Sequence, residues 1–445
     1  MIEDSRRLDG KWIDIGESAM KDNESVHKKG SVQARNIYYF MWPYIILAAI
    51  DFLLTSNPFE ANHGYTSYFV GVGRIFLAIF VIVNLYNLAK KRWRIHIPKS
   101  MILFVFTMIA VSFLNGDFFY YPQKVAADLF RIFFTALLAW QEVQRKNTDV
   151  KENEVKIWKY LVILMIIGVL LVFVGGDNYG RFPVSLHPNR AYRGEVTFWN
   201  TINHMDILLA LSFVLYEYKK KIYFLFPAIF NAGFMYLAWH RTEFIVSITP
   251  FVLYAIFRDR NQTRRIILLS CCIPFIPIVF LVMQRFLVYG FNIKEFTWDL
   301  KFLDYISTYR ASLWVHYIKG FIKYPLTGTG YYYILKDTYT GKAKSEISLL
   351  RWFTEHGILV GGFLLVVMLA SFMKAFKFFR KEKGGDRFSL ILAYIYLMNF
   401  LPSIIQSNGN IGTFSSFLYW YAMFYFFYYK PIGSRTKINF EVKRE

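Results

Sequence analysis

The stretch GILVGGFLLVVMLASF (Gly357–Phe372) contains no charged residue, and the basic run KAFKFFRKEK (Lys374–Lys383) follows one residue later. An apolar run of about 15–20 residues can cross a bilayer as a helix, and a basic flank marks its cytoplasmic end. Similar blocks recur along the 445 residues, which are 55% hydrophobic and 20% aromatic, with a mean hydropathy of +0.30. A soluble domain would show fewer such runs and more charge. The sequence therefore predicts a polytopic integral membrane protein.

The apolar blocks predict an all-α fold with about twelve membrane-spanning helices, because the bilayer interior offers no water to satisfy backbone groups. The predicted spans are 36–55, 67–89, 97–114, 125–140, 157–174, 203–216, 222–239, 244–257, 266–283, 357–372, 388–404 and 414–429. The membrane domain is predicted at 36–430, with cytoplasmic tails at 1–35 and 431–445. A large external helical loop is expected at 284–356.

The net charge of +21 is concentrated between the apolar blocks. The basic connectors are 90–94, 144–151, 219–221, 258–265 and 374–383, whereas 56–65 and 406–412 contain no Lys or Arg. Cytoplasmic connectors carry an excess of these residues, and all the basic ones fall on one side if both termini are cytoplasmic. The excess positive charge is therefore explained by Lys and Arg in the cytoplasmic connectors, and nucleic acid is not expected as a partner.

Two long external connectors carry arginines, which the positive-inside bias disfavours there. Arg181, Arg190 and Arg193 lie in the first connector, at about 175–200. Arg310 and Arg351 are among those in the second, at 284–356. A guanidinium can hold two phosphate oxygens at once, so these residues are candidate ligands for an anionic substrate.

The segment WHRTEF (Trp239–Phe244) places His240 and Arg241 at the external mouth of two neighbouring spans. One interpretation is that Arg241 extends to lipid headgroups at the membrane surface. The other is that the helix ends hold Arg241 rigidly as an anion ligand.

The segment YRASLWVHYIKGFIKYPLTGTG (Tyr309–Gly330) has apolar residues at helical spacing after Arg310, including Trp314. The spacing predicts an amphipathic helix that lies at the membrane interface or on the membrane core. The following PLTGTG predicts a tight turn in which Gly328 and Gly330 let backbone approach a ligand closely.

The segment KSEISLLRWFTEHGILVGG (Lys344–Gly362) predicts another helix that continues into the next span, with Glu346 near its start. One interpretation is a carboxylate that favours the helix dipole. The other is a general base placed over the external arginines.

Charged residues also occur within the predicted spans, where they are costly and usually face a partner or a polar cavity. Asp128 and Arg131 are spaced to pair on one helix face, and Arg74 lies in an earlier span. His204 and Asp206 are similar candidates. A structural ion pair and a substrate contact both remain open for these residues. No histidine has the spacing of a metal-binding motif, so neither a metal nor another cofactor is expected.

The order and placement of four segments resemble the bacterial O-antigen polymerase and O-antigen ligase superfamily. RGEVTFWNTINHMDILLA (Arg193–Ala210) is similar to its Asn-x-x-Asn segment, through Asn200 and Asn203. WHRTEF is similar to its short arginine motif, and RASLWVHYIKGFIKYPLTGTG to its Arg-x-x-x-Trp helix followed by Pro-Leu-x-Gly-x-Gly. SEISLLRWFTEHGILVGG resembles its closing segment, with Glu355 and Gly357 in place.

The resemblance implies a C-type glycosyltransferase-like membrane fold that acts on undecaprenyl-pyrophosphate-linked glycan at the outer face of the bacterial cytoplasmic membrane. For this reaction, Arg241 and Arg310 are the candidate catalytic pyrophosphate ligands, Arg190 or Arg193 would assist them, and Glu346 is the candidate base. The substrate-binding residues expected beside them are Arg181, Arg190, Arg193, Asn200, Asn203, His240, Arg74, Arg131, Trp314, Gly328 and Gly330. Membrane lipids, a chain-length regulator and a flippase are the expected partners.

Ligases of this superfamily carry a His-Asn pair before the Glu-x-Gly, where this chain has Glu346 and Ile347. The difference favours a polymerase of O-antigen, capsule or exopolysaccharide units. The alternatives are a ligase that transfers glycan to another lipid or to protein, and a polysaccharide lipid transporter. Transporters usually show related halves, whereas this chain has one large asymmetric external loop.

Overall fold

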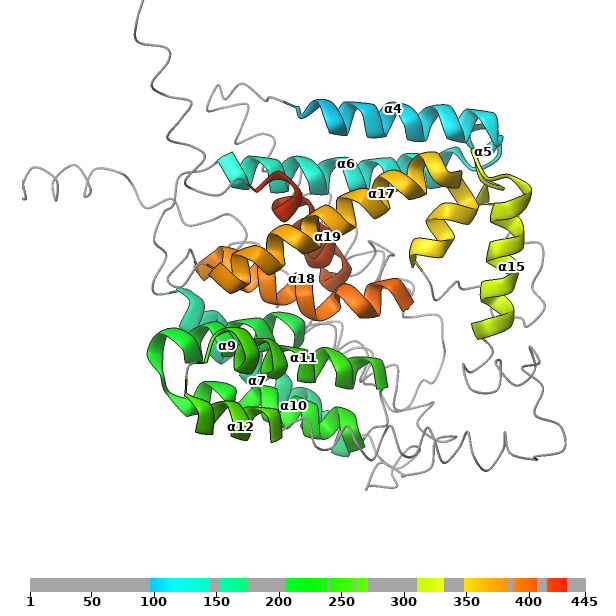
Figure 1. Cartoon of the computed structure of the whole chain (residues 1–445). Coiled ribbons are helices and arrows are strands. Elements are labelled where there is room, and N and C mark those ends of the chain that lie inside the picture. The colour runs from blue at the N-terminus through cyan, green and yellow to red at the C-terminus, as the bar shows by residue number, and fades with distance from the viewer. Residues whose placement is uncertain are drawn as a thin grey trace, which may run out of the picture.

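The computed structural model describes residues 97–144, 153–174, 205–237, 241–259, 261–270, 310–331, 348–381, 387–405 and 414–429. Every regular element in these ranges is helical, and they contain no β-strand (Figure 1). The helices are α4 (Lys99–Leu114), α5 (Asp117–Tyr120), α6 (Pro122–Gln144), α7 (Asn153–Val174), α9 (Met205–Lys219), η1 (Ile222–Leu225), α10 (Phe226–Leu237), α11 (Arg241–Phe257), α12 (Gln262–Ser270), α15 (Arg310–Lys323), α17 (Ser348–Lys381), α18 (Arg387–Ile405) and α19 (Phe414–Tyr428). The prediction of an all-helical chain is confirmed for these residues.

The predicted spans within the described ranges correspond to helices. Spans 97–114, 157–174 and 388–404 match α4, α7 and α18 closely. The boundary predicted at Gly357 is confirmed, because α17 consists of two helices that meet at a non-helical Gly357, and the second helix continues past the predicted Phe372 to Lys381. By length and composition, one helix among the described residues, Leu349–Arg380, could cross a membrane, and four shorter helices are also apolar. The number of spans stays a prediction, and the first two lie outside the described residues.

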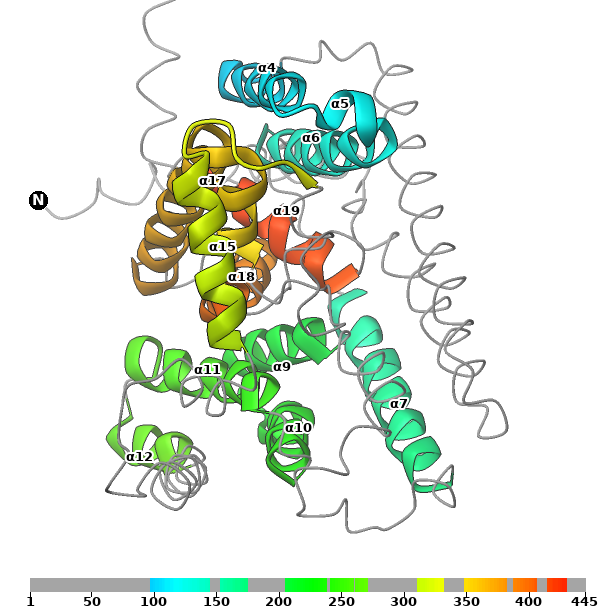
Figure 2. The same cartoon turned by 90° about the vertical axis from the view of Figure 1, so that its right-hand side faces the viewer.

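Helix α17 lies at the centre of the described bundle. It packs against α4, α15, α18 and α19, while α6 packs along α19. Helices α9, α10 and α11 pack on one another and against α18 through α9 and α11. Figures 1 and 2 show α4 and α6 on one side of α17–α19, and α7 with α9–α12 on the other. The amphipathic helix α15 crosses one end of the bundle (Figure 1).

The core between these layers is strongly aromatic. The Tyr394 ring on α18 lies 5.7 Å from the Phe213 ring of α9 and 4.9 Å from the Phe379 ring of α17, measured between centroids. All three side chains are fully buried. Aromatic pairs contribute about 0.5–1.5 kcal/mol beyond the burial of their area. This cluster therefore joins three helices that are distant in sequence.

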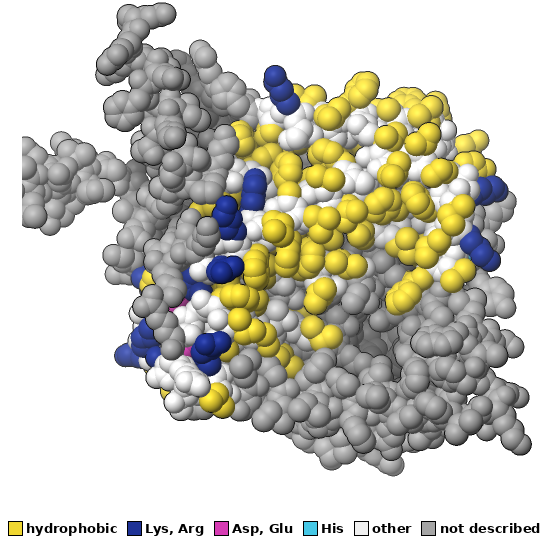
Figure 3. All heavy atoms as spheres, viewed as in Figure 1, with side chains coloured by type: hydrophobic (Ala, Val, Ile, Leu, Met, Phe, Trp, Pro, Cys, Tyr) yellow, Lys and Arg dark blue, Asp and Glu magenta, His cyan; other side chains and the backbone are white. Residues whose placement is uncertain are grey.

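The outer surface of the bundle is also apolar. Phe106 on α4 is 69% exposed, and Val366 and Met373 on α17 are 62% and 65% exposed. Figure 3 shows hydrophobic side chains spread over a broad face, with most of the visible Lys and Arg gathered at its left edge. A large exposed apolar face marks contact with a membrane or another protein. The surface has the character expected of the predicted spans.

Helix ends that flank the basic connectors meet at one end of the bundle. Arg258, just after α11, donates from Nε to Glu217 Oε2 of α9 at 3.0 Å and from Nη1 to the Phe379 carbonyl of α17 at 3.0 Å. Arg387 of α18 pairs with Glu154 of α7 at 3.3 Å. The helix ends next to these basic connectors therefore lie together, as the alternation of basic and uncharged connectors along the sequence predicts. The side of a membrane that this end faces stays a prediction.

Replacing Arg258 with alanine is expected to lower the free energy of unfolding by about 3–5 kcal/mol, because Glu217 would keep the cost of its desolvation without its partner. Chemical unfolding in detergent, followed by circular dichroism, measures the change. Arg265→Ala, on the exposed face of α12, is the matched control and should change stability by less than about 0.5 kcal/mol. Equal unfolding of the two variants would contradict a stabilising role for the Arg258 contacts.

Candidate functional site

The glycine-rich turn after α15 is hydrogen-bonded through its backbone to the N-terminal part of α17. Thr329 N donates to the Thr354 carbonyl at 2.7 Å, and Gly330 N donates to the Glu355 carbonyl at 3.0 Å. The turn and helix that the sequence predicts separately therefore form one unit. We call this unit, the turn Pro325–Gly330 together with Arg351–Gly357 of α17, the turn–helix junction.

Glycines make the close approach at this junction possible. Gly328, Gly330 and Gly357 have φ values of +74°, +73° and +69°, in the left-handed region that side chains disfavour. A Cβ atom on Gly357 would lie 2.2 Å from the Leu326 carbonyl oxygen, and one on Gly328 would lie 2.4 Å from the Glu355 carbonyl oxygen. Gly357 also breaks the helical geometry inside α17. The two backbones touch because neither carries a side chain there.

The connector between α4 and α6 reaches the same junction. The Asn115 side chain donates from Nδ2 to the Glu355 carbonyl at 3.2 Å. Gly116 turns the chain with a φ of +82°, and Asp117 then accepts a hydrogen bond from Tyr331 N at 2.9 Å. Asp117 is 2% exposed, and burial raises the pKa of its carboxyl group to about 6. An elevated carboxyl pKa makes this contact sensitive to pH.

Tyr331, directly after the turn, is held by side chains of α6. Its phenol donates to Asp128 Oδ2 at 2.8 Å, and the Lys124 ammonium lies 3.9 Å from the centre of its ring. Asp128 Oδ1 also lies 3.6 Å from Arg131 Nη1, so the predicted pairing of these two residues is confirmed. Burial raises the pKa of Tyr331, which keeps the phenol protonated as a donor. Two side chains of α6, Lys124 and Asp128, therefore contact Tyr331, and Arg131 joins them through Asp128.

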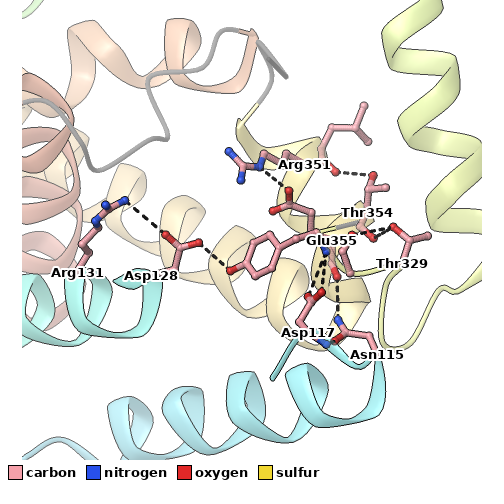
Figure 4. A network of polar contacts seen from close by, with 11 residues as sticks. Asn115, Asp117, Asp128, Arg131, Thr329, Arg351, Thr354 and Glu355 are labelled. Atoms are coloured by element: carbon pink, nitrogen blue, oxygen red, sulfur yellow. Dashed lines mark hydrogen bonds and ion pairs between the residues drawn. The ribbon is translucent and has the colours of Figure 1, made fainter. Parts of the chain in front are cut away.

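The junction also contains a short ion pair and a link to α15. Arg351 Nε donates to Glu355 Oε1 at 2.8 Å, one helical turn away. The Thr354 hydroxyl donates to the Tyr317 carbonyl of α15 at 2.9 Å. Figure 4 shows these residues converging from α5, α6, the turn and α17. The site is therefore assembled from four segments of the chain.

The charges in this network are balanced. Lys124, Arg131 and Arg351 supply positive charge, while the carboxyl groups of Asp117, Asp128 and Glu355 lie among them. Such a network fixes positions and does not concentrate charge of one sign. Within the described part of the chain, no group of three or more His, Cys, Asp or Glu could hold a metal ion.

The chain matches no protein-family model, no curated protein and no solved structure. The resemblance of its motifs to a known superfamily therefore stays a hypothesis.

The structure places some of the predicted site residues at this end of the bundle. Gly328 and Gly330 form the turn, and Arg131 joins its network through Asp128. Arg241 and Arg310 are the first residues of α11 and α15, but their side chains lie outside the described part. The predicted residues outside the described ranges are Arg74, Arg181, Arg190, Arg193, Asn200, Asn203, His240 and Glu346.

Trp314 lies on α15 and is partly buried. Its Nε1 atom is buried and has no hydrogen-bond partner among the described residues. Helix α15 itself confirms the amphipathic helix predicted after Arg310. The structure does not show Trp314 in the hydrogen-bonded network around the turn.

Four residues of this site, Asn115, Asp117, Lys124 and Tyr331, are not among those predicted from the sequence. The first three lie in the short connector NGDFFYYPQK (Asn115–Lys124), where Asp117 is an acidic residue between two apolar blocks. That pattern could have indicated that the connector makes a polar contact with another segment. Nothing local distinguishes Tyr331 from the many other tyrosines of the chain.

Asp117 gives a testable dependence on pH. Because its folded pKa of about 6 lies above the ordinary value of 3.8, folding favours the protonated form. The stability that this preference contributes is fully present below about pH 4 and is lost as pH rises through about 6. Thermal unfolding of wild type and Asp117→Asn at several pH values measures this difference. The wild type should lose stability relative to the variant between about pH 4 and 6, and parallel curves would contradict the assignment.

Proposed function

We propose that the chain is a membrane glycosyltransferase that polymerises undecaprenyl-pyrophosphate-linked oligosaccharide units on the outer face of the bacterial cytoplasmic membrane. In this proposal it is a member of the O-antigen polymerase and ligase superfamily with a C-type glycosyltransferase-like fold. Both termini are cytoplasmic, and the end of the bundle that carries the turn–helix junction faces outward.

The observation that carries this proposal is the contact between two motif-bearing segments. The superfamily resemblance rests partly on PLTGTG and partly on Glu355 with Gly357, and these segments are joined by backbone hydrogen bonds. The glycines in both segments lie where a Cβ atom would overlap the opposite backbone. The spacing of residues in the two motifs therefore has a structural reason. This convergence supports the resemblance more strongly than either motif does alone.

The catalytic arginines are proposed to lie at this same end. Arg258 contacts the basic end of α17, so the opposite end of α11, which begins at Arg241, lies toward the turn. Helix α15 begins at Arg310 and leads directly into the turn. Figure 1 shows both helices reaching the end of the bundle away from the basic connectors. Arg190 or Arg193 would assist them from the preceding external connector.

The reaction is a single displacement. A hydroxyl oxygen of one lipid-linked glycan attacks the anomeric carbon of another, and the bond from that carbon to the pyrophosphate oxygen breaks. The hydroxyl proton passes to Glu346, and undecaprenyl pyrophosphate leaves with both electrons of the broken bond. Arg241 and Arg310 stabilise the negative charge that develops on the leaving group. A single displacement inverts the anomeric configuration, and neither a metal nor another cofactor takes part.

Reconstitution tests this function directly. Purified protein in liposomes is supplied with the lipid-linked repeat units extracted from its own host, and the products are separated by size. A ladder of lengthening glycans is expected, and EDTA should leave it unchanged. Transfer of one unit to a different lipid or to protein would support the ligase alternative. Movement of the intact lipid across the membrane without a new glycosidic bond would support the transporter.

A further inference from the structure

Tyr331 is held at three separate places by the segment that runs from α5 into α6. The Asp117 carboxylate accepts from its backbone N–H at 2.9 Å, and the Asp128 carboxylate accepts from its phenol at 2.8 Å. The Lys124 ammonium lies over its ring at 3.9 Å. The side chain is fully buried. A tyrosine held at its backbone, ring and hydroxyl has little freedom to move.

The fixed position of Tyr331 is transmitted to the turn and to α15. Tyr331 directly follows Gly330, and a Cβ atom on Gly330 would lie 2.6 Å from the Asp117 carboxylate, so the turn sits tightly against α5. On its other side the turn is bonded to α17. Helix α15, which begins at Arg310, ends immediately before the turn. These contacts hold the C-terminal end of α15 through the turn, in addition to the direct packing of α15 on α17.

We propose that Asp128 and Tyr331 are positioning residues for the proposed transferase. The Asp128 carboxylate, itself paired with Arg131, orients the Tyr331 phenol, and Tyr331 in turn fixes the turn that sets the position of α15 and its leading Arg310. This inference rests on the proposed function, because the reaction supplies the reason for holding Arg310 in place. Neither residue is assigned contact with the substrate.

A purely local role for Asp128, as the partner of Arg131 on its own helix, accounts for less of the geometry. Such a pair, spaced three residues apart, needs only one carboxylate oxygen and no tertiary contact. Here Oδ1 faces Arg131, and Oδ2 accepts from a tyrosine that is 203 residues away in the chain. A buried phenol without a partner is unfavourable, so this bond favours one arrangement of the turn.

The test compares Tyr331→Phe, Asp128→Ala and the double variant in liposomes, with glycan formation measured over a range of lipid-linked substrate concentrations. Tyr331→Phe removes the hydroxyl donor and keeps the ring. The expected result is a fall in kcat of about tenfold to a hundredfold, because small misplacement of a reacting group is costly, while KM stays within about twofold. The double variant should resemble the more impaired single variant, since both remove one bond.

Tyr324→Phe is the matched control. Tyr324 lies at the other side of the same turn and is 47% exposed, so loss of its hydroxyl should leave kcat unchanged. Hydrogen exchange of the backbone at 325–331 gives a readout that needs no substrate. The exchange rate should rise at least tenfold in Tyr331→Phe and Asp128→Ala, with α17 and α18 unaffected, because a local opening exposes only the segment that loses its contacts.

The outcomes separate the two proposals. Faster exchange in the turn with an unchanged kcat would overturn the positioning role, and faster exchange throughout α17 and α18 would show a general role in stability instead. An unchanged exchange rate in the turn would also overturn the positioning role of Asp128 and Tyr331. If wild type forms no glycosidic bond while the turn still loosens in both variants, the proposed function fails but the control of the turn by Asp128 stands.

Discussion

Gly357→Ala is expected to abolish polymer formation and to destabilise the turn–helix junction. Gly357 has φ +69° and ψ −171°, a combination that is almost confined to glycine and costs a side-chain-bearing residue about 1–3 kcal/mol. The new methyl group would also lie 2.2 Å from the Leu326 carbonyl oxygen, which forces the turn away at a further cost of about 1–3 kcal/mol. The Ile358 N–Pro325 O hydrogen bond of 2.8 Å would be lost with it.

Gly362→Ala is the control on the same helix. Its Cβ would meet the nearest atom, Ile358 Cγ1, at 3.5 Å, an ordinary contact, and alanine favours a helix interior by about 1 kcal/mol over glycine. Thermal unfolding and the product ladder measure both variants. Gly362→Ala should retain both properties. A Gly357→Ala protein with normal stability and a normal ladder would show that the close backbone contact is dispensable.

Arg310→Ala is expected to reduce the rate of polymer formation by about 10²–10³-fold, as loss of one charge-stabilising donor does in other enzymes. The arginine is proposed to face the leaving pyrophosphate, whose charge grows as the glycosidic bond to phosphate breaks. Arg241→Ala should have an effect of similar size by the same reasoning. Initial rates of ladder formation in liposomes measure both, and thermal unfolding shows whether each variant remains folded.

Lys319→Ala is the control for charge and helix. Lys319 lies on the exposed face of α15, so its removal takes one positive charge from the same helix as Arg310→Ala does. It should leave the rate within about twofold of wild type, because exposed charges away from the reacting group are screened by salt. An equal loss of rate in Lys319→Ala and Arg310→Ala would show that the effect comes from the change in net charge and not from the position of Arg310. Normal rates in both arginine variants would remove the proposed mechanism.

Helix positions could be read from the sequence because the signal is local. An uncharged run such as Gly357–Phe372 must satisfy its backbone internally in an apolar environment, and that requirement holds whatever the run packs against. The pairing of Asp128 with Arg131 was predictable for the same reason, since helical spacing alone brings the two side chains together. The PLTGTG turn was predictable from its glycines and proline.

The contacts that build the site could not be read in this way. Asp117 and Tyr331 are 214 residues apart, and each would be unremarkable in its own segment. The sequence places the boundary between a helix and a span at Gly357, but only the approach of the Leu326 carbonyl explains why that residue is a glycine. Arg351 looked like a free external cation, but Glu355 accepts from it at 2.8 Å. The candidate base Glu346 lies outside the described residues.

The sequence by itself determined the helical character of the described residues, the places where most of those helices run and the charge alternation of their connectors. Each of these depends on residues within one or two helical turns. Only the tertiary structure decided that the turn after α15 lies on α17, and that Asp117 and Asp128 hold Tyr331 from the opposite side. Those contacts depend on shape and on unsatisfied hydrogen-bonding groups across distant segments, which leave no periodic pattern in any one of them.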